Sequence, residues 1–323
     1  MARSTDERAA PLVSVVVPMF DRERFITATV GSVLGQTMPS LELIVFDDGS
    51  RDRSLEITQQ LAAGDERMRV VTGTNGGVAS ARNRGLALTD RRARYVIFLD
   101  SDDVWEPDTL EVLMGVLDDH PELVSAYGLA DCIDADGRPV PGDDLDQQMR
   151  RRVAFRPGGS LTDVPDREPT TFAGLVHHNW VVTPGIHLIR RSVLDEVGPF
   201  DVATDPADDW DLVIRISRRG PVGYVPRVVL HWRRHGSTLT ETSPHWKRAY
   251  FAVLVKTLTD PANTPEQLRL AHRAFRELIR SSARESWSRL RSFDVPTAAR
   301  AAARAAQTSE RYAMASVARH RRR

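Results

Sequence analysis

The chain has 323 residues, of which 41% are hydrophobic and 27% charged, values typical of a globular protein with one large domain or two ordinary ones. Lysine plus arginine and aspartate plus glutamate both number 44, which excludes a strong overall field for nucleic acid. No apolar run approaches the roughly 18 residues of a membrane span, and the N-terminus lacks a signal-peptide core. We therefore expect a soluble, cytoplasmic protein.

Cys132 is the only cysteine, which excludes an intrachain disulfide and fits a reducing compartment. No motif around Cys132 indicates a reactive thiol. We therefore assign it no part in the chemistry.

Strand and helix patterns alternate over about the first 120 residues, which is typical of a mainly parallel sheet with helices on both faces. Short β-branched or apolar runs predict the strands, and apolar residues on one helical face predict the helices. The predicted strands are 12–17, 41–46, 68–72 and 95–99, and the predicted helices are 22–36, a segment ending near Gly64, 78–88 and a segment with Pro107 in its first turn.

The rest of the chain has a different character. Residues 135–170 are rich in Gly, Pro and Asp, so we expect loops there, including a flap over a site. Residues 187–201 and 208–220 have helical character, 222–231 return to the sheet, and 245–323 are helical.

Carboxylates gather where two predicted strands end. Asp47 and Asp48 follow the second strand, and Asp100, Asp102 and Asp103 follow the fourth. Two such charges about 4 Å apart repel by roughly 4 kcal/mol at an effective dielectric near 20. A solvated loop relieves part of this repulsion, and a hard divalent cation relieves it better. Because ligands bind beyond the carboxyl ends of such strands, the two acidic ends predict one shared crevice. The alternative for Asp47 and Asp48 is a structural role, in which they cap and form a turn before Gly49.

The order of four short segments is more specific than any of them alone. PMFDRERF, FDDGSRDRS, TNGGVASARNRGL and LDSDDVW each follow a predicted strand. In this combination the chain resembles the family 2 glycosyltransferases over roughly residues 12–240. The resemblance implies an α/β GT-A fold, a Rossmann-like, mixed and mainly parallel sheet flanked by helices, with a helical C-terminal extension. The implied organisation is a disordered stretch 1–10, a glycosyltransferase domain 11–240 with its nucleotide half at about 11–130 and its acceptor half at about 131–240, and a helical region 241–323.

The resemblance implies roles for residues of the first half. The residues expected beside the donor nucleotide and sugar are Pro18, Phe20, Asp21, Asp48, Asn75, Gly76, Arg82, Asn83, Asp100 and Ser101. Among them Asp48 is expected to bond the base or ribose, while Asp47 fixes the loop. Asp102, with Asp100 nearby, matches the metal-binding position of the DxD motif. Arg82 is otherwise a solvated helix residue, Phe20 ordinary core, and Trp105 a packing residue.

A second acidic segment, ATDPADDWDLVIRIS, resembles the family's catalytic motif. Asp209 matches the base, although Asp208 stands where the family usually has Glu, so either of the pair is a candidate. Neighbouring Asp208 and Asp211 are expected to raise the pKa of Asp209 by like-charge repulsion. The alternative is an acidic first turn favoured by the helix dipole.

The resemblance also extends to HWRRHGSTLT and HHNWVVTPGIH. His235 is expected near the metal or diphosphate, and Arg233 and Arg234 near the phosphates. A structural histidine is the alternative for His235. The residues expected toward the acceptor are Trp180, Thr183 and Asp208, whereas His177 and His178 are equally well loop residues.

The implied function is inverting transfer of a single sugar from a nucleoside-diphosphate sugar to an acceptor hydroxyl, with Mn²⁺ or Mg²⁺ as cofactor. The acceptor is a glycan, a lipid-linked molecule or a small molecule. The Q-x-x-R-W motif and membrane helices of processive synthases are absent from the sequence. The arginines of residues 311–323 suit peripheral contact with an acidic membrane or a solvated helix.

Two other functions remain as alternatives. One is a non-catalytic nucleotide-sugar-binding protein of the same fold, against which the carboxylates Asp48, Asp102 and Asp209 argue. The other is a sugar nucleotidyltransferase. That class has a Gly-rich, basic loop after the first strand, and PMFDRERF lacks the glycines.

Overall fold

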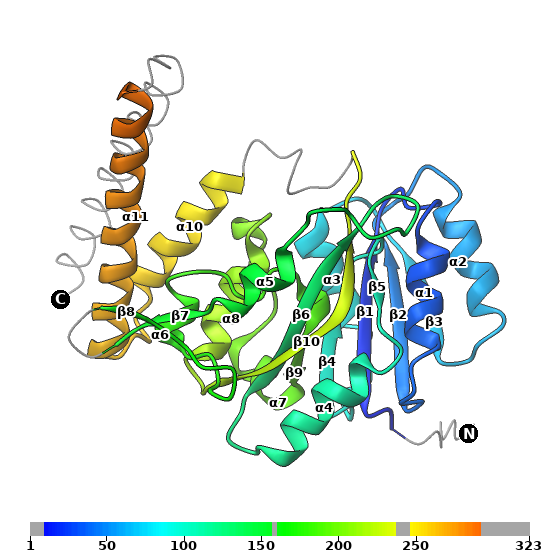
Figure 1. Ribbon diagram of the computed structural model, residues 1–323. Helices are drawn as coiled ribbons and strands as arrows, with labels where there is room; N and C mark the ends of the chain where they lie inside the picture. The colour runs from blue at the N-terminus through cyan, green and yellow to red at the C-terminus, as the bar shows by residue number, and fades with distance from the viewer. Residues whose placement is uncertain (1–9, 157–159, 237–245, 292–323) are drawn as a thin grey trace.

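The computed structural model describes residues 10–156, 160–236 and 246–291. Its centre is an eight-stranded mixed sheet of order β3-β2-β1-β4-β9-β6-β10-β5, accompanied by a β7-β8 hairpin (Figure 1). The strands are β1 (Val13–Met19), β2 (Leu41–Asp47), β3 (Met68–Thr72), β4 (Tyr95–Phe98), β5 (Val104–Trp105), β6 (Ser125–Ile133), β7 (Val153–Phe155), β8 (Leu161–Asp163), β9 (His187–Arg190) and β10 (Val222–Arg233). The predicted α/β class is confirmed.

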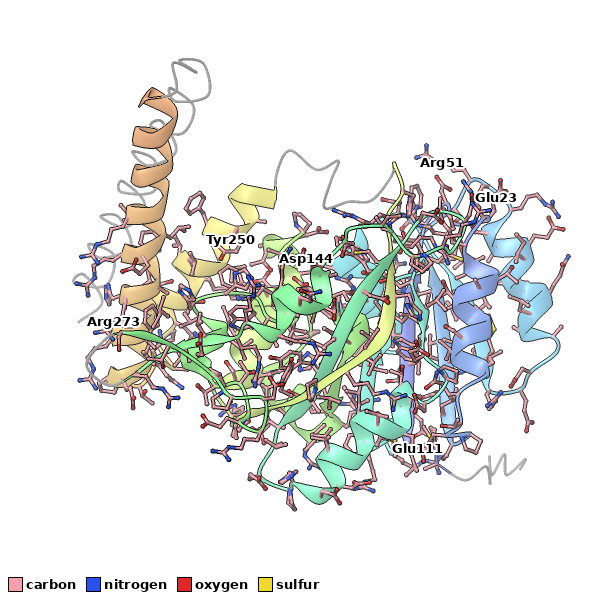
Figure 2. The ribbon with its side chains drawn as sticks, in the orientation of Figure 1. Glu23, Arg51, Glu111, Asp144, Tyr250 and Arg273 are labelled. Carbon is pink, nitrogen blue, oxygen red and sulfur yellow. The ribbon has the colours of Figure 1, made fainter. Side chains whose placement is uncertain are left out.

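Helices flank this sheet (Figure 1). They are α1 (Ile26–Leu34), α2 (Ser54–Ala62), α3 (Val78–Leu86), α4 (Thr109–Asp119), α5 (Leu145–Arg150), α6 (Phe172–Leu175), α7 (Arg191–Val197), α8 (Asp208–Ser217), α10 (Trp246–Thr259) and α11 (Pro265–Arg291), with short 3₁₀ turns η1 (Pro184–Ile186) and η2 (Val202–Thr204). Side chains fill the layers between helices and sheet (Figure 2).

Strand β1 is the centre of the parallel part of the sheet. All seven of its residues are buried, and Val15 lies opposite Leu43 of β2 on one side and Ile97 of β4 on the other. A strand covered on both faces needs apolar residues at successive positions, which explains the Val-Val-Val run of its sequence.

The direction of chain travel reverses beside β1. From β1 the chain moves through α1 to β2 and through α2 to β3, and α3 then returns it to β4 on the other side of β1. Right-handed crossovers place α1 and α2 on one face of the sheet and α3 on the other. The carboxyl ends of β1 and β4 therefore form the switch point where open α/β sheets bind ligands.

One sequence prediction about the sheet was wrong, and two strands were missed. Residues 187–190 were expected to be helical but form β9, which pairs antiparallel with both β4 and β6. The nine-residue strand β6 and the short β5 were missed. Short apolar runs do not distinguish strand from helix, so these elements depend on partners distant in sequence. Trp105 of β5 is buried and donates from Nε1 to the carbonyl of Gly185 at 2.7 Å, so its predicted packing role is confirmed.

The prediction of loops over 135–170 also needs correction, because this segment contains α5 and the β7-β8 hairpin. Arg152 anchors it and is fully buried. The Arg152 guanidinium donates to Oγ1 of Thr170 at 2.8 Å and to the carbonyl of Pro165 at 2.7 Å. These bonds satisfy backbone and side-chain groups that a solvated loop would leave to water.

The predicted helical character of the C-terminal region is confirmed for α10 and α11, which lie at the opposite end of the molecule from α1 and α2 (Figure 1). Tyr250 of α10, labelled in Figure 2, stacks on Trp210 of α8 with ring centroids 4.1 Å apart. Within the described ranges no helix has the length and apolarity to cross a membrane. The predictions for residues 1–9 and for the arginine-rich tail 311–323 lie outside the described residues.

Candidate active site

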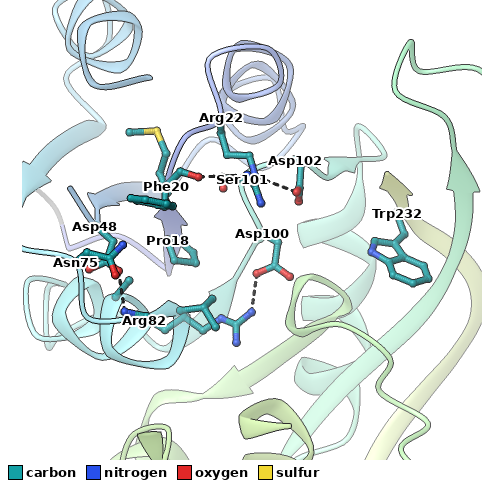
Figure 3. A pocket seen from close by; sticks show the side chains of 14 residues that line it. Pro18, Phe20, Arg22, Asp48, Asn75, Arg82, Asp100, Ser101, Asp102 and Trp232 are labelled. Atoms are coloured by element: carbon teal, nitrogen blue, oxygen red, sulfur yellow. Dashed lines mark hydrogen bonds and ion pairs between the residues drawn. The ribbon is translucent and has the colours of Figure 1, made fainter. Parts of the chain in front are cut away.

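A cavity of about 340 Å³ opens at the carboxyl ends of β1 and β4 (Figure 3). Segments after four strands and the helix α3 surround it. The lining residues are Pro18, Met19, Phe20, Arg22, Asp48, Asn75, Gly77, Val78, Ala81, Arg82, Asp100, Ser101, Asp102 and Trp232. The shared crevice predicted from the two acidic strand ends is therefore present.

Two arginines pair with carboxylates that follow β4. Asp100 accepts a hydrogen bond from Nη2 of Arg82 at 2.6 Å. Asp102 meets Nε of Arg22 at 3.1 Å and Nε2 of His235 at 2.9 Å, both through Oδ2. Figure 3 shows the two arginines reaching the two carboxylates from opposite sides of the cavity. The repulsion expected between these acids is thus offset within the protein.

Asp103, the third of the acids after β4, is fully buried and does not line the cavity. Burial raises its pKa well above the usual range, and the charges of Asp102 and Asp100 raise it further. The backbone N–H of Arg233 donates to Oδ1 of Asp103 at 2.9 Å and opposes this shift. Burial and the neighbouring carboxylates therefore both disfavour a negative charge on Asp103.

The acidic pair after β2 organises loops. Asp47 accepts from the N–H of Ser50 at 3.1 Å and from Oγ1 of Thr72 at 2.7 Å, so it fixes the loop as expected. The Asp48 carboxylate accepts from the N–H groups of Gly76 and Gly77 at 2.9–3.0 Å. Asp48 lines the cavity, but its oxygens already hold the β3-α3 loop. Its predicted contact with a base or ribose stays a prediction.

Arg82 is buried, with only 4% of its surface exposed, so the alternative of a solvated helix residue is wrong. Its Nη1 donates to Asp208 at 2.8 Å while Nη2 holds Asp100. The small and apolar residues of α3 pack this helix closely on the sheet, and a Cβ built on Gly85 would lie 2.5 Å from Val16. Because α3 packs closely on the sheet, the Arg82 side chain reaches both Asp100 at the cavity and Asp208 of α8.

Asp209 is half-buried at the start of α8. Burial raises its pKa from 3.8 to about 7, the charge of Asp208 adds to the rise, and Arg82 opposes it. The expected direction is confirmed, although Asp208 rather than Asp211 is the neighbour responsible. Asp211 instead pairs with Arg215 at 2.9 Å. The charge of Asp100 also raises the pKa of Asp209, so Asp209 lies within electrostatic reach of the cavity.

The donor set at Asp100 and Asp102 fits a hard cation that shares its coordination with a ligand. Oδ2 of Asp100 and Oδ1 of Asp102 have no hydrogen-bond partner among the described residues. Mg²⁺ is commonly held by one or two carboxylates together with substrate phosphates. Within the described chain no three His, Cys, Asp or Glu side chains form a ready-made metal cage. His235 contacts Asp102 and packs against Phe25 in a tilted ring arrangement with centroids 4.6 Å apart.

Several predicted nucleotide-site residues do not line the cavity. Asp21 accepts from the N–H of Arg51 at 2.7 Å, so it ties the β1 loop to the β2 loop. Gly76 contributes the N–H that holds Asp48. Both ends of the Asn83 amide bond the backbone of Phe200, at 2.8 and 2.9 Å. These three residues hold neighbouring backbone segments in place and do not line the cavity.

The predicted acceptor residues Trp180 and Thr183 also do not line this cavity. Both are buried, and Thr183 caps η1 by accepting from the N–H of Gly185 at 3.4 Å. Their assignment to an acceptor stays a prediction. His177 and His178 lie beside α10 and α11 around a separate hollow, and burial lowers the pKa of both.

The predicted approach of Arg233 and Arg234 to phosphates stays a prediction, and both side chains bond other groups of the protein. Nε of Arg233 donates to the carbonyl of Asp102 at 2.8 Å and its Nη1 to that of Asp134 at 3.1 Å. Arg234 pairs with Asp143 at 3.0 Å. Cys132 is buried, and burial raises the pKa of its thiol to about 12, in agreement with an unreactive residue.

Sequence reasoning missed Arg22 and Trp232, which both line the cavity. Arg22 directly follows the predicted Asp21, and Trp232 lies in the HWRRHGSTLT segment. Neither has a local pattern that separates it from its neighbours. The contact of Arg22 with Asp102 spans 80 positions, so only the fold reveals it.

Comparisons with known proteins agree with this geometry. A family profile described as Glycosyl transferase family 2 matches residues 14–198. Chondroitin synthase of Escherichia coli is 27% identical over 253 residues, which are 78% of this chain and 33% of that protein. The chain thus spans about a third of the length of that relative.

Two solved structures are similar in fold. A mannosyltransferase from Pyrobaculum calidifontis in complex with GDP-Man and Mn²⁺ gives a TM-score of 0.62 at 20% identity, covering 96% of this chain and 80% of that one. S. aureus TarS 1-349 in complex with UDP-GlcNAc gives 0.60 at 20% identity, covering 80% and 70%. The GT-A fold implied by the motifs is confirmed.

Proposed function

This chain belongs to glycosyl transferase family 2, and on that basis we propose that it transfers a single sugar from a nucleoside-diphosphate sugar to an acceptor hydroxyl, with inversion and with a divalent cation. The observation that carries the proposal is the link between two acidic groups. Arg82 joins Asp100 of the cavity to Asp208, the neighbour of Asp209. The proposed donor site and the segment of the candidate base are thereby joined by one buried guanidinium, that of Arg82.

The nucleoside is proposed to lie against the wall formed by Pro18, Phe20 and Asn75 (Figure 3). The two similar structures are complexes with UDP-GlcNAc and with GDP-Man, which supports a nucleotide sugar as the class of donor. The diphosphate would then face Asp100 and Asp102. When bound there, a divalent cation would neutralise charge on the departing diphosphate.

The charges of the cavity support this need for a cation. Two arginines and three aspartates line it, an excess of one negative charge. An anionic diphosphate would meet this excess unfavourably, whereas a divalent cation at Asp100 and Asp102 reverses the sign.

Asp209 is the proposed base. A base must titrate near the operating pH and reach the proton that it removes. Asp209 has a pKa of about 7 and is only half-buried, whereas Asp208 is buried and engaged by Arg82. Asp209 would take the proton of the acceptor hydroxyl while the hydroxyl oxygen attacks the anomeric carbon from the face opposite the diphosphate.

Thermal unfolding tests the donor class first. The purified chain is melted with UDP, dTDP or GDP, each with and without Mn²⁺. At about 100 times its dissociation constant a ligand adds roughly 2.7 kcal/mol of stability. We expect one nucleotide to stabilise the chain strongly only with Mn²⁺, and the matching nucleotide sugars then serve as donors in a turnover assay. Binding without turnover of any sugar donor would overturn the transferase and favour a binding protein.

A further inference from the structure

Arg22 lies between the two halves of the cavity. Its Nε donates to Oδ2 of Asp102 at 3.1 Å, and its Nη1 donates to the carbonyls of Phe20 and Asp21 at 3.2 and 3.0 Å. Figure 3 shows the side chain reaching from the Phe20 segment toward Asp102. The guanidinium therefore spans the space between the wall assigned to the nucleoside and the acid assigned to the cation.

Arg22 is also the cavity arginine with an unpaired terminal nitrogen, since the unpaired nitrogen of Arg82 is its buried Nε. Nη2 of Arg22 has no partner among the described residues, and 17% of its side chain is exposed. Both Nη atoms of Arg82, the other lining arginine, are taken by Asp208 and Asp100.

We propose that Arg22 exchanges partners when donor binds: it neutralises Asp102 in the free protein and donates to the diphosphate when Asp102 turns to a divalent cation. This proposal rests on the proposed function. It assigns Arg22 as a diphosphate-binding residue. It also explains how the charge of Asp102 is balanced while no divalent cation is bound.

The physical basis is charge balance at Asp102. A guanidinium presents a planar fork of donors that matches carboxylate and phosphate equally well. Because a charge-assisted bond to the diphosphate replaces the one to Asp102, the exchange costs little free energy. While Arg22 holds Asp102, it competes with a cation for the same carboxylate. Once the diphosphate is present, the arginine and the cation no longer compete, so nucleotide and cation bind cooperatively.

Titration calorimetry of Arg22→Gln tests both halves of the exchange. UDP, GDP and dTDP are titrated with Mn²⁺ present, their nucleosides are titrated alongside, and Mn²⁺ is titrated alone. We expect diphosphate affinity to fall by about 10- to 100-fold, as for a lost hydrogen bond to a charged group. Nucleoside affinity should be unchanged, and affinity for Mn²⁺ alone should rise.

Two companion variants separate charge from general damage. Arg24→Gln removes a nearby, exposed arginine that pairs with Asp136 at 2.7 Å, and all three affinities should stay as in wild type. Arg22→Lys keeps a positive charge beside Asp102, so affinity for Mn²⁺ alone should stay near wild type while diphosphate affinity still falls.

Three results would overturn the exchange. The first is equal loss of nucleoside and diphosphate affinity in Arg22→Gln, which would make Arg22 a support of the nucleoside wall. The second is unchanged diphosphate affinity. The third is Mn²⁺ affinity that is unchanged or lower in Arg22→Gln. Wild-type protein that binds none of the three diphosphates would instead overturn the proposed function, and the exchange with it.

Discussion

Nη1 of Arg82 donates to Oδ2 of Asp208 at 2.8 Å, joining α3 to α8 across 126 positions of sequence. The side chains of both residues are at most 5% exposed. Since Arg82 also holds Asp100 at 2.6 Å, the two acidic segments found in the sequence meet at one guanidinium. The two neighbouring acids at the start of α8 should therefore have separable roles.

We predict that Asp208→Asn lowers the free energy of unfolding by about 3 kcal/mol, because it leaves a buried arginine with one carboxylate instead of two. Asp209→Asn should not destabilise the chain at neutral pH, yet it should lower turnover by about 10²- to 10⁴-fold, as expected for loss of a base. Urea unfolding and donor turnover of both variants check this. Loss of turnover in Asp208→Asn without loss of stability would identify Asp208 as the base.

The pKa of Asp209 predicts the pH dependence of turnover. A base acts in its deprotonated form, and the pKa of this carboxyl is raised from 3.8 to about 7. We therefore expect kcat/KM to fall about tenfold per pH unit below about pH 7 and to level off above it. The profile of kcat/KM with subsaturating acceptor measures this. A profile that stays flat down to about pH 5 would show that no such group controls the reaction.

The same shift predicts the pH dependence of stability. Because the folded pKa of Asp209 is raised, its contribution to stability is fully present below the ordinary value of 3.8 and is lost as pH rises through about 7. Asp209→Asn removes this loss. Melting temperatures of variant and wild type should therefore diverge in favour of the variant as pH rises from 3.8 to about 7 and keep a constant difference above that. A difference that does not change between these two pH values would contradict the shift.

Two helical glycines should respond oppositely to alanine. A Cβ on Gly85 of α3 would lie 2.5 Å from Cγ1 of Val16, whereas a Cβ on Gly115 of α4 would meet no atom within 4 Å. We expect Gly85→Ala to destabilise the chain by about 1–3 kcal/mol through overpacking. Gly115→Ala should stabilise it by roughly 0.5–1 kcal/mol. Chemical unfolding compares the pair, and equal effects would mean that α3 packs less closely on β1.

Helix α10 is predicted to support the proposed base, Asp209. Lys256 of α10 contacts Asp201 at 2.6 Å and Asp211 of α8 at 2.9 Å. Lys256→Met should cost about 1–3 kcal/mol, because Asp211 is buried and loses a charged donor, and it should also lower turnover by disturbing α8. Thr259→Ala, at an exposed site on the same helix, is the control. Unchanged turnover in Lys256→Met would make α10 a stability element only.

Local sequence determined the parallel half of the fold. The runs at 12–17, 41–46, 68–72 and 95–99 have the apolar and β-branched composition of doubly covered strands, and they correspond to β1, β2, β3 and β4. Because such strands end at one edge, the positions of the acids after β2 and β4 already located the cavity. The strands β5, β6 and β9 lacked such a signal, since their pairing partners lie far along the chain.

The sequence by itself also identified the residue types of the site, the acids at 48, 100, 102 and 209 and the arginine at 82. Only the tertiary structure decided which charges meet. Asp102 pairs with Arg22 and His235 from two other segments, Arg82 bonds both Asp100 and Asp208, and Asp103 is fully buried. Ionic contacts depend on distances of a few ångströms between side chains that are far apart in sequence. A one-dimensional pattern contains no such distance, so it names the charged groups but not their partners.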